Sequence, residues 1–290
     1  MTSTAAAGSG STTEKLEADA ERRLKEITSL RNPALQRYRG LRDSRARRET
    51  GLAAAEGFNL LREALLSETG LVQVFLSERA RGRADFADIA ARLEAGESAG
   101  HWECFAVRGE VLERAAHTES PQGVLAIFRP RVFSLEEVLA GDGPVLLLDR
   151  IADPGNLGLI LRTAEAADCN GVVAGPGTVD PFNPKCVRAS AGSIFRLPVV
   201  HADLEAAAAA LATAGGRLFA TSPHGELVYT SADLSGRIGL LLGQEGGGLA
   251  QGFLDRFAGL RIPTGRVESL NVAMAAGVLL YEARRQRAAG

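Results

Sequence analysis

The chain has few cysteines and histidines, the side chains that most often build disulfide frameworks and metal sites. Its 290 residues include three cysteines and four histidines. Cys104, Cys169 and Cys186 are widely separated and show neither the paired spacing of a disulfide framework nor that of a zinc site. The histidines are isolated from one another in the sequence. We therefore expect free thiols in a reducing compartment and no bound metal.

Long apolar runs and an excess of charge of one sign are also lacking. No stretch approaches the roughly 18 apolar residues of a membrane helix, and residues 1–13 contain no apolar signal-peptide core. These first residues are small and polar, so we expect them to be disordered. The formal net charge of -2 does not by itself indicate a nucleic-acid binder. We expect a cytoplasmic protein without a membrane partner.

What the chain does have is a local run of basic residues in its first fifth. Leu35, Tyr38 and Leu41 fall at helical spacing within this run, which predicts a helix over 34–48 with apolar residues inward and arginines outward. A local basic run in a neutral protein is a candidate phosphate-binding face, although a solvated charged helix gives the same pattern. The candidate contacts are Arg31, Arg37, Arg39, Arg45, Arg47 and Arg48.

Alternating strand and helix patterns predict an α/β protein with a first domain over 14–130, a linker over 131–143 and a second domain over 144–290. In the second domain this alternation predicts a parallel sheet covered by helices on both faces. The expected strands of the first domain cover 53–57, 71–76, 102–107 and 124–128, and its helices 14–28, 34–48, 58–67, 84–94 and 111–116. The expected strands of the second cover 145–149, 171–174, 197–200, 218–220 and 238–242, and its helices 159–168, 183–189, 204–214 and 269–287.

Two loops near the C-terminus are candidates for ligand binding. Residues 243–249, GQEGGGL, follow the apolar run 238–242, and ligands bind at the carboxyl ends of strands in open α/β sheets. A second loop follows a short strand and leads to a long apolar helix that we expect to open near Ser269 as its N-cap. The glycine spacing fits neither a dinucleotide-binding fingerprint nor a Walker A loop.

Three polar residues are weak indicators of function singly but form a recognisable pattern together. Arg162 alone could pair with Glu165, Asn156 could simply cap a helix, and Glu245 could be a surface acid. Their motifs, however, stand in a defined order. These are Asn156-x-Gly158-x-x-x-Arg162-Thr163-Ala164, then residues 242–249, then Ile262-Pro263 with Ser269-Leu270-Asn271-Val272.

This order closely resembles the three motifs of the SpoU branch of the SPOUT RNA 2'-O-ribose methyltransferases, over residues 145–287. Residues 25–130, with Asn32-Pro33 and residues 55–57, look like the substrate-binding domain often fused in front, which is similar to a ribosomal RNA-binding protein. The resemblance implies an α/β fold in which a SPOUT α/β-knot, a parallel sheet with a deep trefoil knot, follows a small α/β RNA-binding domain.

The resemblance also implies a cofactor, S-adenosylmethionine, and roles for particular residues. Arg162 matches the catalytic arginine, and we expect it to orient the ribose hydroxyl and stabilise the developing alkoxide, because a guanidinium is a reluctant base. The matching polar residues around it are Asn156, Glu245, Ser269 and Asn271, with Glu245 expected to orient Arg162 or its neighbours. The matching cofactor positions are Gly243, Ile262 and Leu270, and Thr221, Ser222 and Pro223 are lesser candidates. Lys185 and Arg188 match basic residues that contact RNA, with plain surface charge as the alternative.

Members of this family are homodimers with the last helix at the interface, so Val272, Ala275, Ala276, Leu279 and Leu280 could form that contact, although they fit a monomer core as well. The expected substrate is 23S ribosomal RNA. Relatives in antibiotic producers methylate it for self-resistance, a role that the scarcity of lysine, typical of GC-rich genomes, permits. The alternatives are a transfer-RNA methyltransferase, a non-catalytic RNA-binding or assembly protein of the same fold, and, more distantly, a nicotinamide oxidoreductase.

Overall fold

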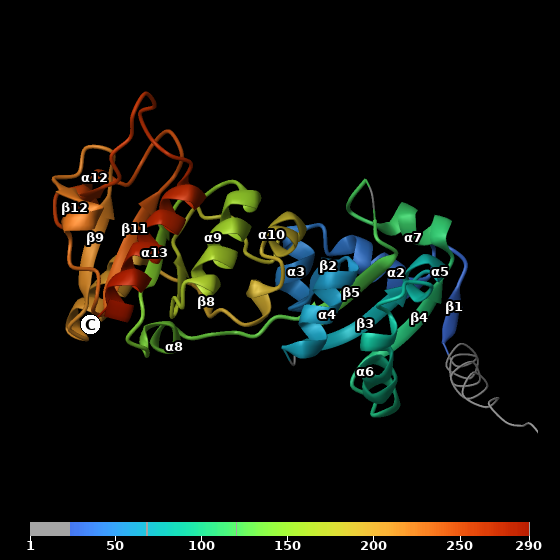
Figure 1. Cartoon of the computed structure of the whole chain (residues 1–290). Helices are drawn as coiled ribbons and strands as arrows, with labels where there is room; N and C mark the ends of the chain where they lie inside the picture. The colour runs from blue at the N-terminus through green and yellow to red at the C-terminus, as the bar shows by residue number, and fades with distance from the viewer. Residues whose placement is uncertain (1–23, 68, 120, 290) are drawn as a thin grey trace, which may run out of the picture.

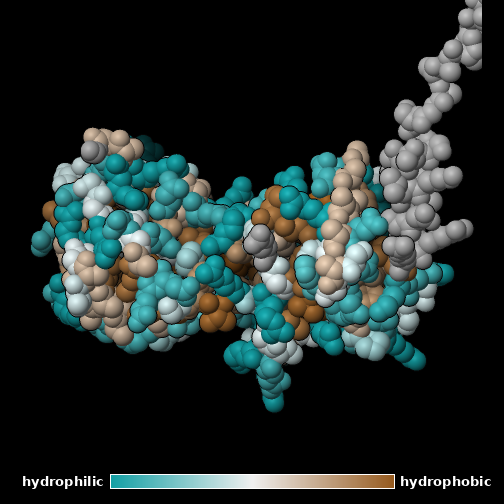
Figure 2. All heavy atoms as spheres, turned by 90° about the horizontal axis from the view of Figure 1, so that it is seen from below, coloured by the Kyte–Doolittle hydropathy of each residue, from teal (hydrophilic) through white to brown (hydrophobic). Residues whose placement is uncertain are grey.

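Two β-sheets, one in each half of the chain, organise the molecule (Figure 1). The computed structural model describes residues 24–67, 69–119 and 121–289. The disorder expected for residues 1–13 and most of the helix expected over 14–28 therefore lie outside the described residues. In the space-filling view the two halves form lobes joined by a narrower waist (Figure 2).

The N-terminal lobe is a mixed five-stranded sheet with the strand order β1-β4-β3-β5-β2. β1 pairs with β4 and β4 with β3 in parallel, whereas β5 is antiparallel to both β3 and β2. Alternate residues of β3 face opposite sides, so Val74 packs in one apolar cluster and Phe75 in another. The strands are β1 Lys25–Ile27, β2 Ala53–Glu56, β3 Gly70–Leu76, β4 Glu103–Val107 and β5 Val124–Arg129. The helices are α2 Pro33–Gly40, α3 Ser44–Thr50, α4 Phe58–Leu66, α5 Glu78–Arg81, α6 Ala87–Ser98 and α7 Gly109–Ala115.

Two expectations for this lobe are wrong in detail. The end of the helix expected over 14–28 is instead the edge strand β1, whose backbone pairs with β4. The helix expected over 34–48 is two helices, because α2 ends at Gly40 and Asp43 caps α3 through a hydrogen bond from the backbone N–H of Arg45. Leu35, Tyr38 and Leu41 are buried, as their spacing predicts.

The C-terminal lobe confirms the expected parallel sheet with helices on both faces. Its strand order is β10-β12-β9-β11-β6-β7-β8, and every neighbouring pair among the described strands is parallel. The strands are β6 Val145–Asp149, β7 Gly171–Ala174, β8 Val199–His201, β9 Arg217–Thr221, β10 Leu227–Val228, β11 Ile238–Gly243 and β12 Ala258–Arg261. The helices are α8 Leu135–Leu139, α9 Pro154–Ala166, α10 Pro184–Ala189, α11 Leu204–Thr213, α12 Gln251–Leu254 and α13 Val272–Ala289, with short 3-10 turns at Ser193–Phe195 and Tyr229–Ser231.

The two faces of this sheet are covered by different helices. Leu146 and Leu148 of β6 pack in one cluster with residues of α9 and α13. Leu147 packs on the opposite side with residues of α8, α11 and α12. α8 falls within the expected linker 131–143, and its Val138 and Leu139 are buried in this second cluster. The covered sheet leaves the carboxyl ends of its strands as the edge from which the long loops emerge.

The junction between the lobes is held by apolar and ionic contacts. Phe128 of β5 meets Phe195 edge to face with ring centroids 5.1 Å apart. Arg196 pairs with Glu63 of α4 at 2.8 Å and with Glu165 of α9. The expectation that Arg47 points outward is wrong: its guanidinium lies 2.7 Å from Asp180 and donates to the carbonyls of Leu41 and Arg42.

We expect Arg47→Ala to lower the free energy of unfolding by roughly 3 kcal/mol, because it leaves the Asp180 carboxylate without its cation in a mostly buried place. The side chain of Arg47 is 4% exposed and that of Asp180 is 30% exposed. The neighbouring exposed arginine provides a control, since Arg48→Ala removes the same groups and is expected to change stability by less than about 0.5 kcal/mol. Urea unfolding of both variants measures this change. Equal losses in the free energy of unfolding would show that the buried ion pair contributes no more to stability than the exposed Arg48 does.

Candidate active site

The polar and glycine-rich loops gather at the carboxyl edge of the C-terminal sheet. β11 and β12 both flank β9, so the loops that follow all three strands emerge side by side. The backbone N–H of Ser222, just after β9, donates to the carbonyl of Leu260 in β12 at 3.0 Å. The two loops singled out in the sequence are also joined directly, because the side chain of Asn271 donates to Glu245. The expected proximity of these loops is confirmed.

The loop after β11 is a tight turn that only glycine permits at its start. A Cβ on Gly243 would lie 2.2 Å from the backbone carbon of Gly248 and 2.3 Å from the backbone nitrogen of Leu249. The N–H of Gly248 donates to the carbonyl of Gln244 at 2.9 Å, which closes the turn. Gly246 and Gly248 both have positive φ angles, of 78° and 61°. The backbone of this loop therefore carries no side chain at its glycines and packs closely against itself.

Two residues that the sequence analysis missed hold this loop. Asp149, buried at the end of β6, accepts a hydrogen bond from the backbone N–H of Ala250 at 3.0 Å. Arg150 pairs with Asp149 at 2.8 Å and donates to the carbonyl of Gly248 at 3.3 Å. A signal for them was present, since a charged pair at the end of an otherwise apolar buried strand is unusual.

Asn271 brings the three motifs together. Its Nδ2 donates to Asn156 Oδ1 at 3.1 Å and to Glu245, while its Oδ1 accepts from the backbone N–H groups of Ala273 and Met274. Asn271 is thus the residue that caps α13, and the expected cap at Ser269 is wrong. The cluster combines the first turn of α9, the glycine loop and the start of α13.

Helix α9 begins earlier than expected. Pro154 is its first residue and Asp153 its N-cap, accepting from the N–H of Asn156 at 2.9 Å, whereas the sequence predicted a helix only from residue 159. Asn156 therefore lies in the first helical turn. A Cβ on Gly158 would lie 2.6 Å from the carbonyl oxygen of Cys186, so this glycine allows α9 to approach α10 closely.

Arg162 is exposed on α9 and forms no hydrogen bond or ion pair with any residue that the structure describes. The salt bridge to Glu165 considered from the sequence is not made, because Glu165 pairs with Arg196 instead. Glu245 contacts Asn271, a neighbour in the cluster, and not Arg162 itself. Arg162 lies six positions after Asn156, which places the two on different faces of the helix. The Arg162 guanidinium is thus available to a molecule outside the described chain.

The remaining candidate cofactor residues border the same loops. Thr221 donates its hydroxyl to the carbonyl of Leu241, and the Ser222 hydroxyl accepts from the N–H of His224. Both side chains are therefore engaged within the fold, and so are the backbone groups of Ser222, whose N–H donates to Leu260 and whose carbonyl accepts from the N–H of Gly225 at 3.1 Å. The others differ in exposure: Ile262 is half-buried, whereas Pro223, Ser269 and Leu270 are exposed.

The candidate RNA residues differ in exposure and in their ion pairs. Lys185 pairs with Asp153 at 2.8 Å, so part of its charge is already balanced. Arg47 is buried at the lobe junction. Arg188 is exposed and forms no ion pair with a described residue. Of the arginines around α2 and α3, those that are exposed are Arg31, Arg37, Arg39, Arg45 and Arg48, with Arg45 paired to Glu49.

The apolar face considered for dimerisation is mostly the core of this chain. Val272, Ala276, Leu279 and Leu280 are buried in the cluster beneath α9 and α13. A different part of α13 presents apolar residues to solvent, where Met274 is 57% and Tyr281 51% exposed, seven residues apart on one helix face.

Other side-chain chemistry is sparse in residues 24–67, 69–119 and 121–289. Three or more potential metal ligands do not gather anywhere in these ranges. The thiols of Cys104, Cys169 and Cys186 are buried, and burial raises their pKa. Among the described helices, no apolar stretch is long enough to cross a membrane.

Two family models match the chain, one in each lobe. Residues 143–281 match the SpoU rRNA Methylase family, and residues 32–126 match the MRM3-like substrate binding domain. These ranges fall on the C-terminal and N-terminal sheets respectively. The resemblance drawn from the three motifs is confirmed.

Individual proteins resemble almost the whole chain. The 23S rRNA (guanosine(2553)-2'-O)-methyltransferase RlmP of Bacillus subtilis is 33% identical over 263 residues, which cover 90% of this chain and all of that protein. The crystal structure of an AdoMet-bound rRNA methyltransferase from Sinorhizobium meliloti is similar with a TM-score of 0.79 and 34% identity, covering 90% of this chain and 98% of the other. AviRb from Streptomyces viridochromogenes, a SpoU methyltransferase in complex with AdoMet, has a TM-score of 0.78 and 27% identity over 90% and 100% of the two chains. Taken with the assembled motifs, these likenesses mean that the chain belongs to the SpoU rRNA methylase family.

Proposed function

We propose that the protein transfers the methyl group of S-adenosylmethionine to a ribose 2'-hydroxyl of 23S ribosomal RNA. The observation that carries this proposal is the contact of Asn271 with both Asn156 and Glu245, which assembles all three motifs at one edge of the sheet. The names of the similar proteins support the reaction and the substrate class.

The geometry of the glycine loop fits a cofactor held by backbone groups. Gly243 has no room for a side chain, and the Thr221 and Ser222 hydroxyls are engaged within the fold. Main-chain atoms of residues 243, 262 and 270 would therefore hold S-adenosylmethionine, with the apolar side chains of Ile262 and Leu270 beside it and residues 221–223 bordering the site. The cofactor supplies an activated methyl group, so the protein needs mainly to align the attacking oxygen with it.

In this proposal Arg162 binds the RNA at the reacting ribose. An arginine is effectively always protonated, so its guanidinium orients the 2'-hydroxyl and stabilises the alkoxide that develops as the proton leaves. Asn156, Asn271 and Glu245 form a polar wall that positions the loop and the ribose, and Ser269 belongs to the same loop. No step requires a metal.

We further propose a homodimer in a cytoplasmic setting, with a deep trefoil knot in the C-terminal lobe and domain limits at residues 14–130 and 144–290. The exposed Met274 and Tyr281 on α13, with Leu159 on the adjacent α9, support an interface on this face. Sedimentation of wild type against Tyr281→Glu tests it, since a charge in a buried apolar contact shifts the protein toward monomer.

The decisive experiment is transfer of labelled methyl from S-adenosylmethionine to total RNA, followed by primer extension on ribosomal RNA from cells with and without the gene. Label in transfer RNA alone would favour the transfer-RNA enzyme, and no incorporation with wild type would favour a non-catalytic RNA-binding protein. Self-resistance is a narrower proposal, tested by the antibiotic susceptibility of the same cells.

We expect charge reversal on α3 to weaken RNA binding and flatten its salt dependence. Arg45→Glu/Arg48→Glu removes two exposed cations, so the slope of log affinity against log salt should fall by about one to two units. The matched control is Arg92→Glu/Arg114→Glu, which changes net charge equally at exposed positions on α6 and α7. Equal slopes of log affinity against log salt for the two double variants would show that α3 does not contact the RNA.

A further inference from the structure

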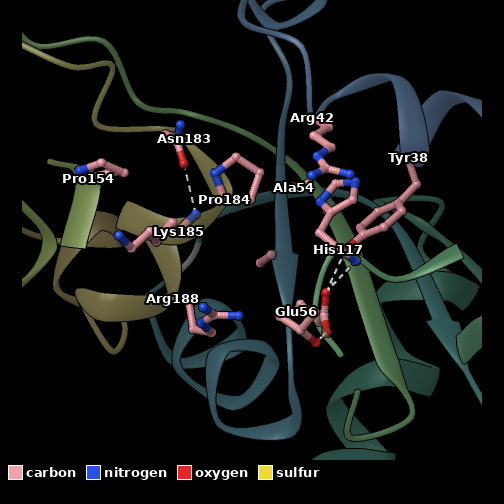
Figure 3. A pocket seen from close by; sticks show the side chains of 12 residues that line it. Tyr38, Arg42, Ala54, Glu56, His117, Pro154, Asn183, Pro184, Lys185 and Arg188 are labelled. Carbon is pink, nitrogen blue, oxygen red and sulfur yellow. Dashed lines mark hydrogen bonds between the residues drawn. The ribbon is translucent and has the colours of Figure 1, made fainter. Parts of the chain in front are cut away.

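A groove runs along the junction of the two lobes, separate from the loops at the sheet edge. It consists of two adjoining hollows of about 420 and 620 Å³. Glu56, His117, Thr118 and Arg188 line both hollows, so the two are continuous. In the close-up, Glu56 and His117 of the N-terminal lobe lie across the open space from Arg188 of α10, whereas the side chain of Lys185 points away from them and pairs with Asp153 (Figure 3).

Glu56 stands at the centre of this groove, at the last position of β2. Its carboxylate accepts from the backbone N–H of His117 at 3.0 Å, from the hydroxyl of Thr118, and more weakly from Tyr38 at 3.4 Å. Oε2 accepts from His117 and, at a long distance, from Tyr38, whereas Oε1 accepts from Thr118 alone. A ligand that displaces the weak Tyr38 contact therefore finds one lone-pair site on each oxygen. These contacts fix the carboxylate in place without neutralising it.

The groups that hydrogen-bond to Glu56 carry no charge that would balance it. Burial lowers the pKa of His117, so its ring is neutral near pH 7, and it stacks on Tyr38 with ring centroids 4.7 Å apart. Burial raises the pKa of Tyr38, which therefore keeps its proton. Glu56 forms no ion pair with Arg42 or Arg188, the described arginines that line the groove beside it.

Both signs of charge thus face one cavity without meeting. Arg42 and Arg188 form no ion pair with a described residue, although each lines the groove. A ligand that offers N–H donors to a carboxylate and negative groups to two guanidinium side chains satisfies all three at once. A nucleotide has this combination, since base edges carry donors and the flanking phosphates carry charge.

The groove also lies next to the motif cluster. Pro154, the first residue of α9, lines it, and Asn156 of the cluster follows two residues later, about 3 Å further along the helix. An RNA strand that fills the groove can therefore continue to the ribose site. The nucleotide in the groove is a neighbour of the methylated one, because Arg162 and Asn156 lie outside the groove lining.

Resting on the function proposed above, we propose that this groove binds an unpaired guanosine of the substrate RNA, with its base on Glu56 and the adjoining phosphates on Arg42 and Arg188. Guanine presents two neighbouring donors, N1–H and the N2 amino group, that match the two oxygens of a carboxylate. Uracil presents one N–H between two carbonyls, which repel a carboxylate. Adenine and cytosine offer an amino group without a neighbouring ring N–H.

The test measures binding of three labelled RNA octamers by fluorescence anisotropy: all uridine, uridine with one central guanosine, and uridine with one central inosine. Inosine keeps N1–H and lacks the N2 amino group, so it isolates one donor. For wild type we expect guanosine to bind roughly five- to a hundred-fold more tightly than uridine, with inosine between them. Glu56→Gln should reduce the ratio to within about two-fold. The control Glu113→Gln, an exposed acid on α7, should preserve it.

Equal affinity of wild type for the three octamers, or an unchanged ratio of guanosine to uridine affinity in Glu56→Gln, would contradict the proposal that the groove binds guanosine. If Glu56→Gln fails to fold, Arg188→Gln decides: it should weaken all three octamers alike and reduce the salt slope by about one unit, and unchanged binding would overturn the groove. Methyl transfer to total RNA is measured in parallel. Transfer without guanosine preference rejects only the groove, and preference without transfer rejects only the proposed reaction.

Discussion

Arg162→Ala is expected to abolish methyl transfer to RNA while leaving the affinity for S-adenosylmethionine within a few-fold of wild type. The guanidinium is exposed and forms no hydrogen bond or ion pair with a described residue, so its removal should not disturb the fold. Loss of one preorganised donor at a developing oxyanion typically lowers the rate by about a hundred- to a thousand-fold, and a charged donor contributes at least as much. Single-turnover methylation with saturating RNA measures this effect directly.

Two further variants separate charge and position in this experiment. Arg162→Lys keeps the positive charge but loses the planar fork, so we expect it to recover only a small part of the activity. Arg92→Ala removes an exposed arginine from α6 and should retain full activity. Unfolding of Arg162→Ala would instead make the residue structural, and a rate within ten-fold of wild type would remove it from the chemistry.

Gly243→Ala is expected to weaken cofactor binding by at least ten-fold, with loss of methyl transfer as the consequence. The added Cβ would lie 2.2 to 2.4 Å from backbone atoms of Gly248 and Leu249, distances that backbone cannot accept without moving. The turn must therefore open, and the main-chain groups proposed to hold the cofactor lose their positions. Calorimetric titration with S-adenosylmethionine measures the loss.

A matched glycine lies nine residues further along the chain. Gly252 is in α12, has no atom within 4 Å of an added Cβ, and lacks the positive φ that strains other residues. Gly252→Ala should therefore bind the cofactor as wild type does. Equal affinities for both alanine variants would show that the cofactor does not depend on the closed turn.

The sequence predicts the C-terminal lobe well because local signals and global fold agree there. Continuous apolar runs such as 238–242 identify buried parallel strands, and the glycines after them mark the turn that the structure shows. The motif residues Asn156, Glu245 and Asn271 meet as their shared motif pattern implies. Their roles toward cofactor and RNA remain predictions.

Other features depend on partners that are distant in the sequence. Arg47 looks like its exposed neighbours, and only the position of Asp180, 133 residues later, draws it into the junction. The edge strand β1 also depends on a distant partner, because Lys25–Ile27 becomes a strand only by pairing with β4. The groove around Glu56 combines residues from both lobes, so no local pattern could reveal it.

The junction has a consequence for how a long RNA is selected. Arg196 pairs with α4 and α9 at once, and Phe128 packs against Phe195, so both contacts favour one arrangement of the two lobes. In this arrangement the distance between the two lobes' binding sites is fixed. The reacting ribose must therefore lie a set number of nucleotides along the RNA from the nucleotide that the first lobe binds. Inserting a single nucleotide between them would leave both ends of the RNA intact and still put the wrong ribose in place.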